Sequence, residues 1–147
     1  MKKVIIYTDG ACSVNPGPGG YGAILNYLGV EKIISGYQEL TTNNRMELTA
    51  CIEALKLLKE RCEVDLYTDS SYVCNAFTEN WIAKWIANDF FVGTKKETKN
   101  IDLWKELIAL TNYHVVNWFK VKGHADNINN NRCDKLATDE IKKHRMA

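Results

Sequence analysis

The stretch from Val4 to Gly22, VIIYTDGACSVNPGPGGYG, places an apolar, β-branched run directly before Asp9 and a loop rich in glycine, asparagine and proline. Such a run predicts a strand over residues 3–9. A single acid at a strand end is usually a turn residue. However, VDLYTDSS at residues 64–71 contains the same Tyr-Thr-Asp triplet, so that Asp69 repeats Asp9. Two acids in equivalent positions call for a search for further residues of the same kind.

Length and composition are those of an ordinary globular protein. The 147 residues suit one domain with a sizeable core, and 46% of them are apolar and 25% charged. No apolar run approaches the roughly 18 residues that span a bilayer. The apolar part of MKKVIIYTDG is too short for a signal peptide. We therefore expect a cytoplasmic protein that has no membrane partner.

The cysteines and the net charge narrow the classes of function only slightly. There are five cysteines and no C-x-x-C pair, so we expect reduced thiols rather than disulfides or a thiolate zinc site. The net charge is +1, although KVKGH, KKHR and the segment around residues 84–99 are locally basic. This balance permits a nucleic-acid partner without requiring one.

The pattern of elements predicts one α/β domain over residues 1–147. Three strands form a meander, and later strands alternate with helices. Strands are expected over residues 3–9, 21–29, 31–40, 64–69 and 114–123. Helices are expected over residues 45–61, 70–77, 80–90, 101–112 and 131–144. Residues 92–100 are expected to form a polar loop.

The first long helix carries an acid on its apolar side. At 100° per residue the apolar face consists of Cys51, Ala54, Leu55 and Leu58. The opposite, polar face consists of Thr49, Glu53, Lys56 and Glu60. Glu47 falls on the apolar face, where an acid without a partner is rare. Alternatively, Glu47 is a first-turn residue that interacts with the helix dipole or caps back toward Thr42 or Asn43.

The three acids make a coherent group if the strands that end at Asp9 and Asp69 are parallel neighbours. Their carboxyl ends then lie side by side, where ligand sites of open α/β sheets form, and Glu47 adds a third carboxylate. Two carboxylates about 4 Å apart repel by about 4 kcal/mol at an effective dielectric constant of about 20. They stay ionised together only around a cation, and oxygen ligands favour magnesium or manganese over zinc.

Four motifs in order resemble one family. They are YTDGACSVNPGPGGYG, TTNNRMELTACIEAL, YTDSSYV and VKGHADNINNNRCDKLA. Together they are similar to type 1 ribonuclease H in its bacterial single-domain form, from residue 3 to about residue 142. The resemblance implies a ribonuclease H-like α/β fold, a five-stranded mixed sheet flanked by helices. It also implies hydrolysis of the RNA strand of RNA–DNA hybrids, which leaves 5′-phosphate and 3′-hydroxyl ends.

The resemblance also implies a catalytic set. The metal-binding carboxylates would be Asp9, Glu47, Asp69 and Asp134, which would hold two Mg²⁺ ions during catalysis, with Mn²⁺ as a substitute. His124 of VKGHA would assist catalysis or product release, and its imidazole can carry a proton near neutral pH. For His114 and His144 we favour surface loop positions.

Substrate contacts follow from the same resemblance. Positions that line the nucleic-acid groove and read RNA 2′-hydroxyls are Cys12, Asn15, Asn43 and Asn44. Asn15 and Thr42 match a pocket for a phosphate of the DNA strand. The segment that begins at Trp81 matches a basic protrusion, whose phosphate-binding candidates are Lys84, Lys95, Lys96 and Lys99. The other three tryptophans of the chain, Trp85, Trp104 and Trp118, are expected to be mainly structural.

Some residues depart from the family pattern. Leu40 stands where an arginine is often found, and Ser71 stands where a glutamine follows TDS. The protrusion also contains Asp89 and Glu97, which make it less basic than in many relatives. These departures leave the carboxylates intact and put the hybrid affinity and its salt dependence in question.

Three other functions fit less well. A hybrid-binding module without activity would require the loss of a carboxylate, and all four are present. DNA nucleases or integrases of the same fold lack the pair NNRMEL and VKGHA in this form. A structural protein would have no reason to place Glu47 on an apolar face. We therefore expect a monomeric enzyme whose partner is an RNA–DNA hybrid duplex.

Overall fold

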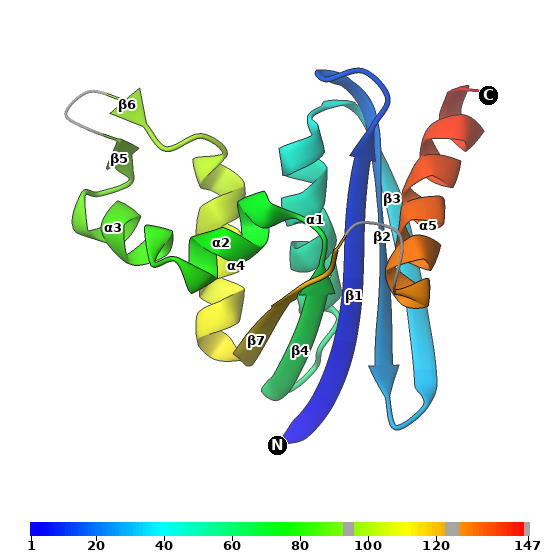
Figure 1. The fold of residues 1–147 in the computed structure, drawn as a ribbon, viewed down its shortest axis with the longest axis horizontal. Coiled ribbons are helices and arrows are strands. Elements are labelled where there is room, and N and C mark those ends of the chain that lie inside the picture. Colours follow the sequence, from blue (N-terminus) through cyan, green and yellow to red (C-terminus); the bar gives the residue numbers. More distant parts are fainter. Residues whose placement is uncertain (93–95, 123–126, 146–147) are drawn as a thin grey trace.

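A central five-stranded sheet organises the molecule (Figure 1). The computed structural model describes residues 1–92, 96–122 and 127–145. The strand order is β3-β2-β1-β4-β7. These strands are β1 (Lys2–Cys12), β2 (Gly17–Tyr27), β3 (Val30–Thr41), β4 (Cys62–Thr68) and β7 (Val115–Lys120). The first three form an antiparallel meander, and β1, β4 and β7 are parallel neighbours, which confirms the predicted mixed sheet.

Helices cover both faces of the sheet. They are α1 (Asn43–Lys56), α2 (Ser71–Thr78), α3 (Trp81–Ala87), α4 (Ile101–Tyr113) and α5 (Ile128–Arg145). Helix α1 packs on β1 and β2 with α4 beside it, whereas α5 packs on β1, β2 and β3. None of the helices in the described part of the chain is long and apolar enough to cross a membrane.

The main core lies between the sheet and α1. Alternate residues of the strands point into it, among them Ile6 and Leu66, which meet Leu48 of α1. Burying such a side chain fully stabilises the fold by about 1.5–3 kcal/mol. Trp104 of α4 is fully buried, and its indole N–H donates a hydrogen bond to the Tyr72 hydroxyl at 3.0 Å. Trp104 is therefore structural, as predicted.

Two glycines of the opening stretch let helices approach the sheet closely. A Cβ at Gly10 would overlap the backbone of Met46 and Glu47 at the start of α1. A Cβ at Gly22 of β2 would overlap Leu136 and the Cys133 carbonyl of α5. These contacts, one on each face of the sheet, explain why the strand-forming segments are interrupted by glycine.

The observed elements differ from the predicted ones in three places. Helix α1 ends at Lys56 rather than residue 61, because the chain must turn before it enters β4 at Cys62. Thr49 is buried rather than solvent-facing, and its hydroxyl donates to the Arg45 carbonyl at 2.7 Å. The segment predicted as a polar loop contains a short antiparallel pair, β5 (Phe91–Val92) and β6 (Lys96–Glu97).

The prediction of surface loop positions is wrong for His114, which is buried, and wrong in part for His144, which is exposed but lies in a helix. His114 is only 4% exposed, and its Nδ1 accepts a hydrogen bond from the Cys62 N–H at 3.1 Å. Burial lowers the pKa of His114. His144 lies in the last turn of α5, where its ring stacks on Tyr37 with a centroid distance of 3.8 Å. Both imidazoles therefore have structural partners.

Candidate metal centre and nucleic-acid interface

Three carboxylates converge at one end of the parallel strands. One oxygen each from Asp9, Glu47 and Asp69 lies within 4.8 Å of the others. Asp9 lies near the end of β1, Asp69 directly follows β4, and Glu47 lies in the first turns of α1. The parallel pairing of β1 with β4 brings the two repeated Tyr-Thr-Asp triplets side by side.

The backbone around Gly10 fixes the orientation of two of these acids. The Gly10 N–H donates to a carboxylate oxygen of Asp9 at 3.0 Å and also to Oε1 of Glu47. The close approach of α1 that glycine permits is therefore also the contact that places Glu47 beside Asp9. Glu47 lies on the inward face of α1 because it takes part in this cluster.

The cluster is electrostatically unfavourable without a cation. Burial first, and then the nearby Asp69 and Asp134 carboxylates, raise the pKa of Asp9 to about 8. Burial, followed by the charges of Asp9 and Asp69, raises the pKa of Glu47 well above its ordinary value. Two unit charges at the separation found here repel by about 3 kcal/mol at an effective dielectric constant of about 20. A bound cation would remove this penalty.

The carboxylates open into a pocket of about 370 Å³. Its walls come from the end of β1, the start of α1, the β4–α2 junction and α5. The lining residues are Asp9, Gly10, Ala11, Cys12, Asn43, Asn44, Glu47, Asp69, Ser70 and Asp134. Asp134, the fourth carboxylate of the predicted set, therefore faces the same space. The clustered donors, Asp9, Glu47 and Asp69, are carboxylates, and such oxygen ligands fit Mg²⁺ or Mn²⁺.

Several predicted substrate contacts lie at the same pocket. Cys12, Asn43 and Asn44 line it directly. Asn15 lies next to it, since its side-chain oxygen accepts a hydrogen bond from the Asn43 N–H at 3.1 Å. Thr42 is the N-cap of α1, where its hydroxyl accepts the Arg45 N–H at 3.2 Å. The structure thus gathers these residues at the N-terminus of α1, beside the carboxylates.

The remaining predicted contacts belong to a separate region, the protrusion, which comprises α3, β5 and β6. Trp81 is half-buried and packs beside Trp85, with ring centroids 6.5 Å apart. Lys99, just after β6, is exposed. Lys95 and His124 lie outside the described residues, as does the side chain of Lys96. Among the described residues, none of α3, β5 or β6 lines the carboxylate pocket, and these elements lie apart from β1 in Figure 1.

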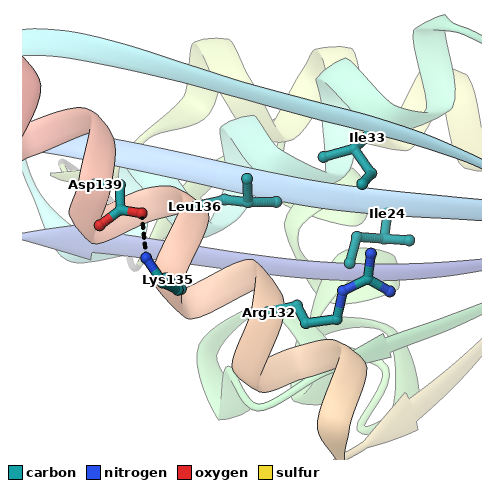
Figure 2. A pocket seen from close by; sticks show the side chains of 6 residues that line it. All are labelled: Ile24, Ile33, Arg132, Lys135, Leu136 and Asp139. Atoms are coloured by element: carbon teal, nitrogen blue, oxygen red, sulfur yellow. Dashed lines mark hydrogen bonds and ion pairs between the residues drawn. The ribbon is translucent and has the colours of Figure 1, made fainter.

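A second pocket, between α5 and the strands β2 and β3, lacks the features of a cation site. Figure 2 shows its lining from α5, β2 and β3. The pocket has a volume of about 310 Å³ and apolar walls that include Ile24, Ile33 and Leu136. Its carboxylate, Asp139, is paired with Lys135 at 2.8 Å. The carboxylate pocket at the strand ends is therefore the better candidate for a functional site.

Sequence reasoning missed two polar residues near the carboxylates. Ser70 lines the pocket and caps α2 by accepting the Val73 N–H at 3.2 Å. Asn130 is buried beneath the site and bonds to both β1 and β4. Its position one helical turn before Asp134 was the available signal, because residues at i and i+4 share a helix face.

The mixed sheet, with its carboxylate cluster at the ends of two parallel strands, is the arrangement of a ribonuclease H-like nuclease. Comparisons with known proteins agree. The RNase H family model matches residues 1–142. The ribonuclease H of Acetivibrio thermocellus is 64% identical over 143 residues, 97% of each chain. That of Caldanaerobacter subterraneus is 60% identical over 141 residues, 96% of this chain and 92% of the relative. The chain therefore belongs to the ribonuclease H family, whose members are endonucleases.

Solved structures show the same fold. LC9-RNase H1, a type 1 RNase H with the type 2 active-site motif, superposes with a TM-score of 0.85 at 30% identity, covering 97% of this chain and 73% of that one. LC11-RNase H1, solved in complex with an RNA/DNA hybrid, superposes with a TM-score of 0.66 at 25% identity, covering 97% of this chain and 99% of that one.

Proposed function

We propose that this chain, as one ribonuclease H domain over residues 1–147, hydrolyses the RNA strand of RNA–DNA hybrids and leaves 5′-phosphate and 3′-hydroxyl ends. The observation that carries the proposal is the convergence of Asp9, Glu47 and Asp69 within 4.8 Å in an open pocket. A relative with the same fold was solved with an RNA/DNA hybrid bound, which supports this substrate class.

The four carboxylates would hold two Mg²⁺ ions, with Mn²⁺ as a substitute. The bound ions would supply a Lewis acid for the departing oxygen and an activated water as nucleophile. Asp9 and Glu47 are held by the Gly10 N–H, so their oxygens are oriented before any ion arrives. Asp69, directly after β4, and Asp134 of α5 line the same pocket and would supply the remaining ligands. His124 is proposed to carry a proton close to the reacting groups, since imidazole titrates near neutral pH.

Recognition of the hybrid would use both regions. Cys12, Asn43 and Asn44 line the pocket wall, where they can contact the RNA strand and its 2′-hydroxyls. Asn15 and Thr42, at the N-terminus of α1, are proposed to hold a phosphate of the DNA strand. Trp81, Lys95, Lys96 and Lys99 of the protrusion segment would contact further phosphates.

The proposal includes a monomer that acts in the cytoplasm. All five cysteines are free thiols, and four of them are buried. Unpaired thiols of this kind are expected in a reducing compartment. Size-exclusion chromatography with light scattering would test the monomeric state directly.

One experiment tests the activity. RNA–DNA, RNA–RNA and DNA–DNA duplexes of one sequence, labelled on each strand, would be incubated with the protein in Mg²⁺ and in chelator. We expect cleavage only of the RNA strand of the hybrid and only in Mg²⁺, with products that accept a new 5′ label only after phosphatase treatment. Binding of the hybrid without cleavage, or equal cleavage in chelator, would contradict the proposal.

A further inference from the structure

Asn130 lies beneath the carboxylate pocket, where strands β1 and β4 begin to separate. Its side chain belongs to α5 and the residue is only 5% exposed. The Asn130 amide donates one hydrogen bond to the Thr8 carbonyl and one to the Tyr67 carbonyl, both at 3.2 Å. Thr8 immediately precedes Asp9, and Tyr67 lies two residues before Asp69.

The position of these two bonds matters because the β1–β4 ladder stops there. Paired residues of β1 and β4 run from Lys2 with Cys62 to Tyr7 with Tyr67. Beyond that pair, β1 continues beside β2, while the chain after β4 turns into α2. The Asn130 amide joins the two strands at the end of their ladder, directly before the two acids.

The chemistry of an amide suits this position. Both neighbouring groups are carbonyl acceptors, so only the NH₂ side of the Asn130 amide can face them, and its two N–H groups are both used. The Asn130 Oδ1 atom is buried without a hydrogen-bond partner among the described residues. An unpaired buried acceptor is unfavourable, so the side chain is retained for its donors. Aspartate or leucine could not donate to either carbonyl.

We infer that Asn130 is a positioning residue that sets the separation of Asp9 and Asp69 and couples both to Asp134, one turn further along α5. Asn130 is not among the described residues that line the pocket, so it acts through the carboxylates rather than on the substrate. The inference rests on the proposed function, in which these acids hold the metal ions. Groups that orient metal ligands typically change metal affinity or activity about 10–100-fold when removed.

The test uses Asn130→Ala and Asn130→Leu, which both lack donors, while leucine keeps the number and branching of the side-chain heavy atoms. Asn131→Ala is the matched control, because Asn131 is the next residue of α5 and is exposed. Mn²⁺ affinity would be measured without nucleic acid by calorimetry, at a temperature where circular dichroism shows each variant to be folded. If the alanine variant fails to fold, the leucine variant carries the test.

We expect Mn²⁺ to bind about tenfold more weakly to both Asn130 variants and normally to the control. At limiting Mn²⁺, kcat should fall about tenfold with an unchanged KM for the hybrid, and higher Mn²⁺ should restore it. A purely structural role would not give this rescue by metal. Unchanged Mn²⁺ affinity, or a loss expressed in KM alone, would overturn the inference. If the wild type cuts no hybrid while the affinity difference persists, the proposed function fails and the positioning role stands.

Discussion

The carboxylate site and the protrusion differ in how firmly the rest of the fold fixes them. Asp9 is 5% exposed and lies on β1, the central strand of the sheet, where it pairs with Gly22 of β2 just beyond the end of the β1–β4 ladder. In contrast, α3 of the protrusion has no buried residue, and its N-cap, Asn80, makes no side-chain capping bond. Groups that stabilise a reacting centre must be positioned closely, whereas phosphate contacts need charge and reach. Changes at the site should therefore act on kcat, and changes in the protrusion should act on KM.

The largest effect should come from the centre of the site. Asp69→Asn keeps the shape of the side chain and removes one of the charges that attract the metal ions. We expect kcat to fall by at least about a hundredfold, given what a metal contributes as Lewis acid and source of the nucleophile. The KM for the hybrid should change less than about twofold. Single-turnover cleavage and Mn²⁺ titration would measure the two consequences.

Asp65→Asn is the matched control for this substitution. Asp65 lies on β4, the strand that leads to Asp69, but its carboxylate pairs with Lys3 at 3.2 Å and accepts a hydrogen bond from Asn117 at 3.0 Å. The activity of this variant should stay near that of the wild type. Equal losses of activity in the two variants would show that replacing any acid on or after β4 impairs the enzyme. The contrast between the site and its surroundings would then disappear.

The second effect concerns proton transfer rather than metal binding. His124→Ala should lower kcat by about a hundredfold, the low end for general acid–base catalysis, because water can replace part of the function. Mn²⁺ affinity should not change. His144→Ala is the control, since that ring stacks on Tyr37 in the last turn of α5. Loss of Mn²⁺ binding in His124→Ala would place His124 among the metal ligands instead.

The site was more predictable from the sequence than its supporting contacts. Repeated strand ends and a misplaced helical acid indicated Asp9, Asp69 and Glu47, because periodicity reports which side chains share a face. The same reasoning failed for Thr49, which is buried on the side of the helix expected to be polar and whose hydroxyl is satisfied locally by the Arg45 carbonyl. It also failed for His114, whose partner is the Cys62 N–H, 52 residues earlier in the chain. Tertiary hydrogen bonds between distant residues leave no local pattern.

The third prediction concerns the cost of the metal-free cluster. Without metal, the pKa of Asp9 in the folded protein is about 8, above its unfolded value of 3.8. The contribution of Asp9 to the free energy of unfolding is therefore fully present below about pH 4 and is lost as the pH rises to about 8. Asp9→Asn should therefore stabilise the metal-free protein at pH 8 by at least about 1 kcal/mol, since one pKa unit corresponds to about 1.4 kcal/mol. The gain should shrink toward pH 4. Urea unfolding in chelator would measure it.

Metal ions should reverse the order of stability between the wild type and Asp9→Asn. Saturating Mg²⁺ stabilises a protein in proportion to its affinity for the folded state, so the wild type should gain more than Asp9→Asn. Asp65→Asn again serves as control and should show no pH-dependent gain. If Asp9→Asn destabilises the metal-free protein at pH 8, the acids do not repel one another, and the contrast between a strained site and a relaxed periphery is wrong.

The smallest effect should come from the protrusion, and it should appear in KM rather than in kcat. Replacing Lys95, Lys96 and Lys99 by alanine should raise KM several-fold and leave kcat unchanged, because these side chains would bind phosphates away from the reacting bond. The slope of log affinity against log salt should also become shallower by about 0.9 for each phosphate that the variant no longer neutralises. Cleavage rates at several salt concentrations would give both quantities.

Lys32 and Lys59 provide a control in which two positive charges are removed at the opposite end of the molecule. Lys32 lies near the β2–β3 turn, and Lys59 follows the end of α1, far from the strand ends that carry the acids (Figure 1). Their alanine variants change the net charge without removing a proposed phosphate ligand, so KM and its salt slope should stay near wild type. A similar rise in KM would mean that overall charge, not the protrusion, attracts the hybrid. A fall in kcat from the protrusion variant alone would instead show that the protrusion positions the reacting strand, and the division between a site that governs chemistry and a periphery that governs binding would not hold.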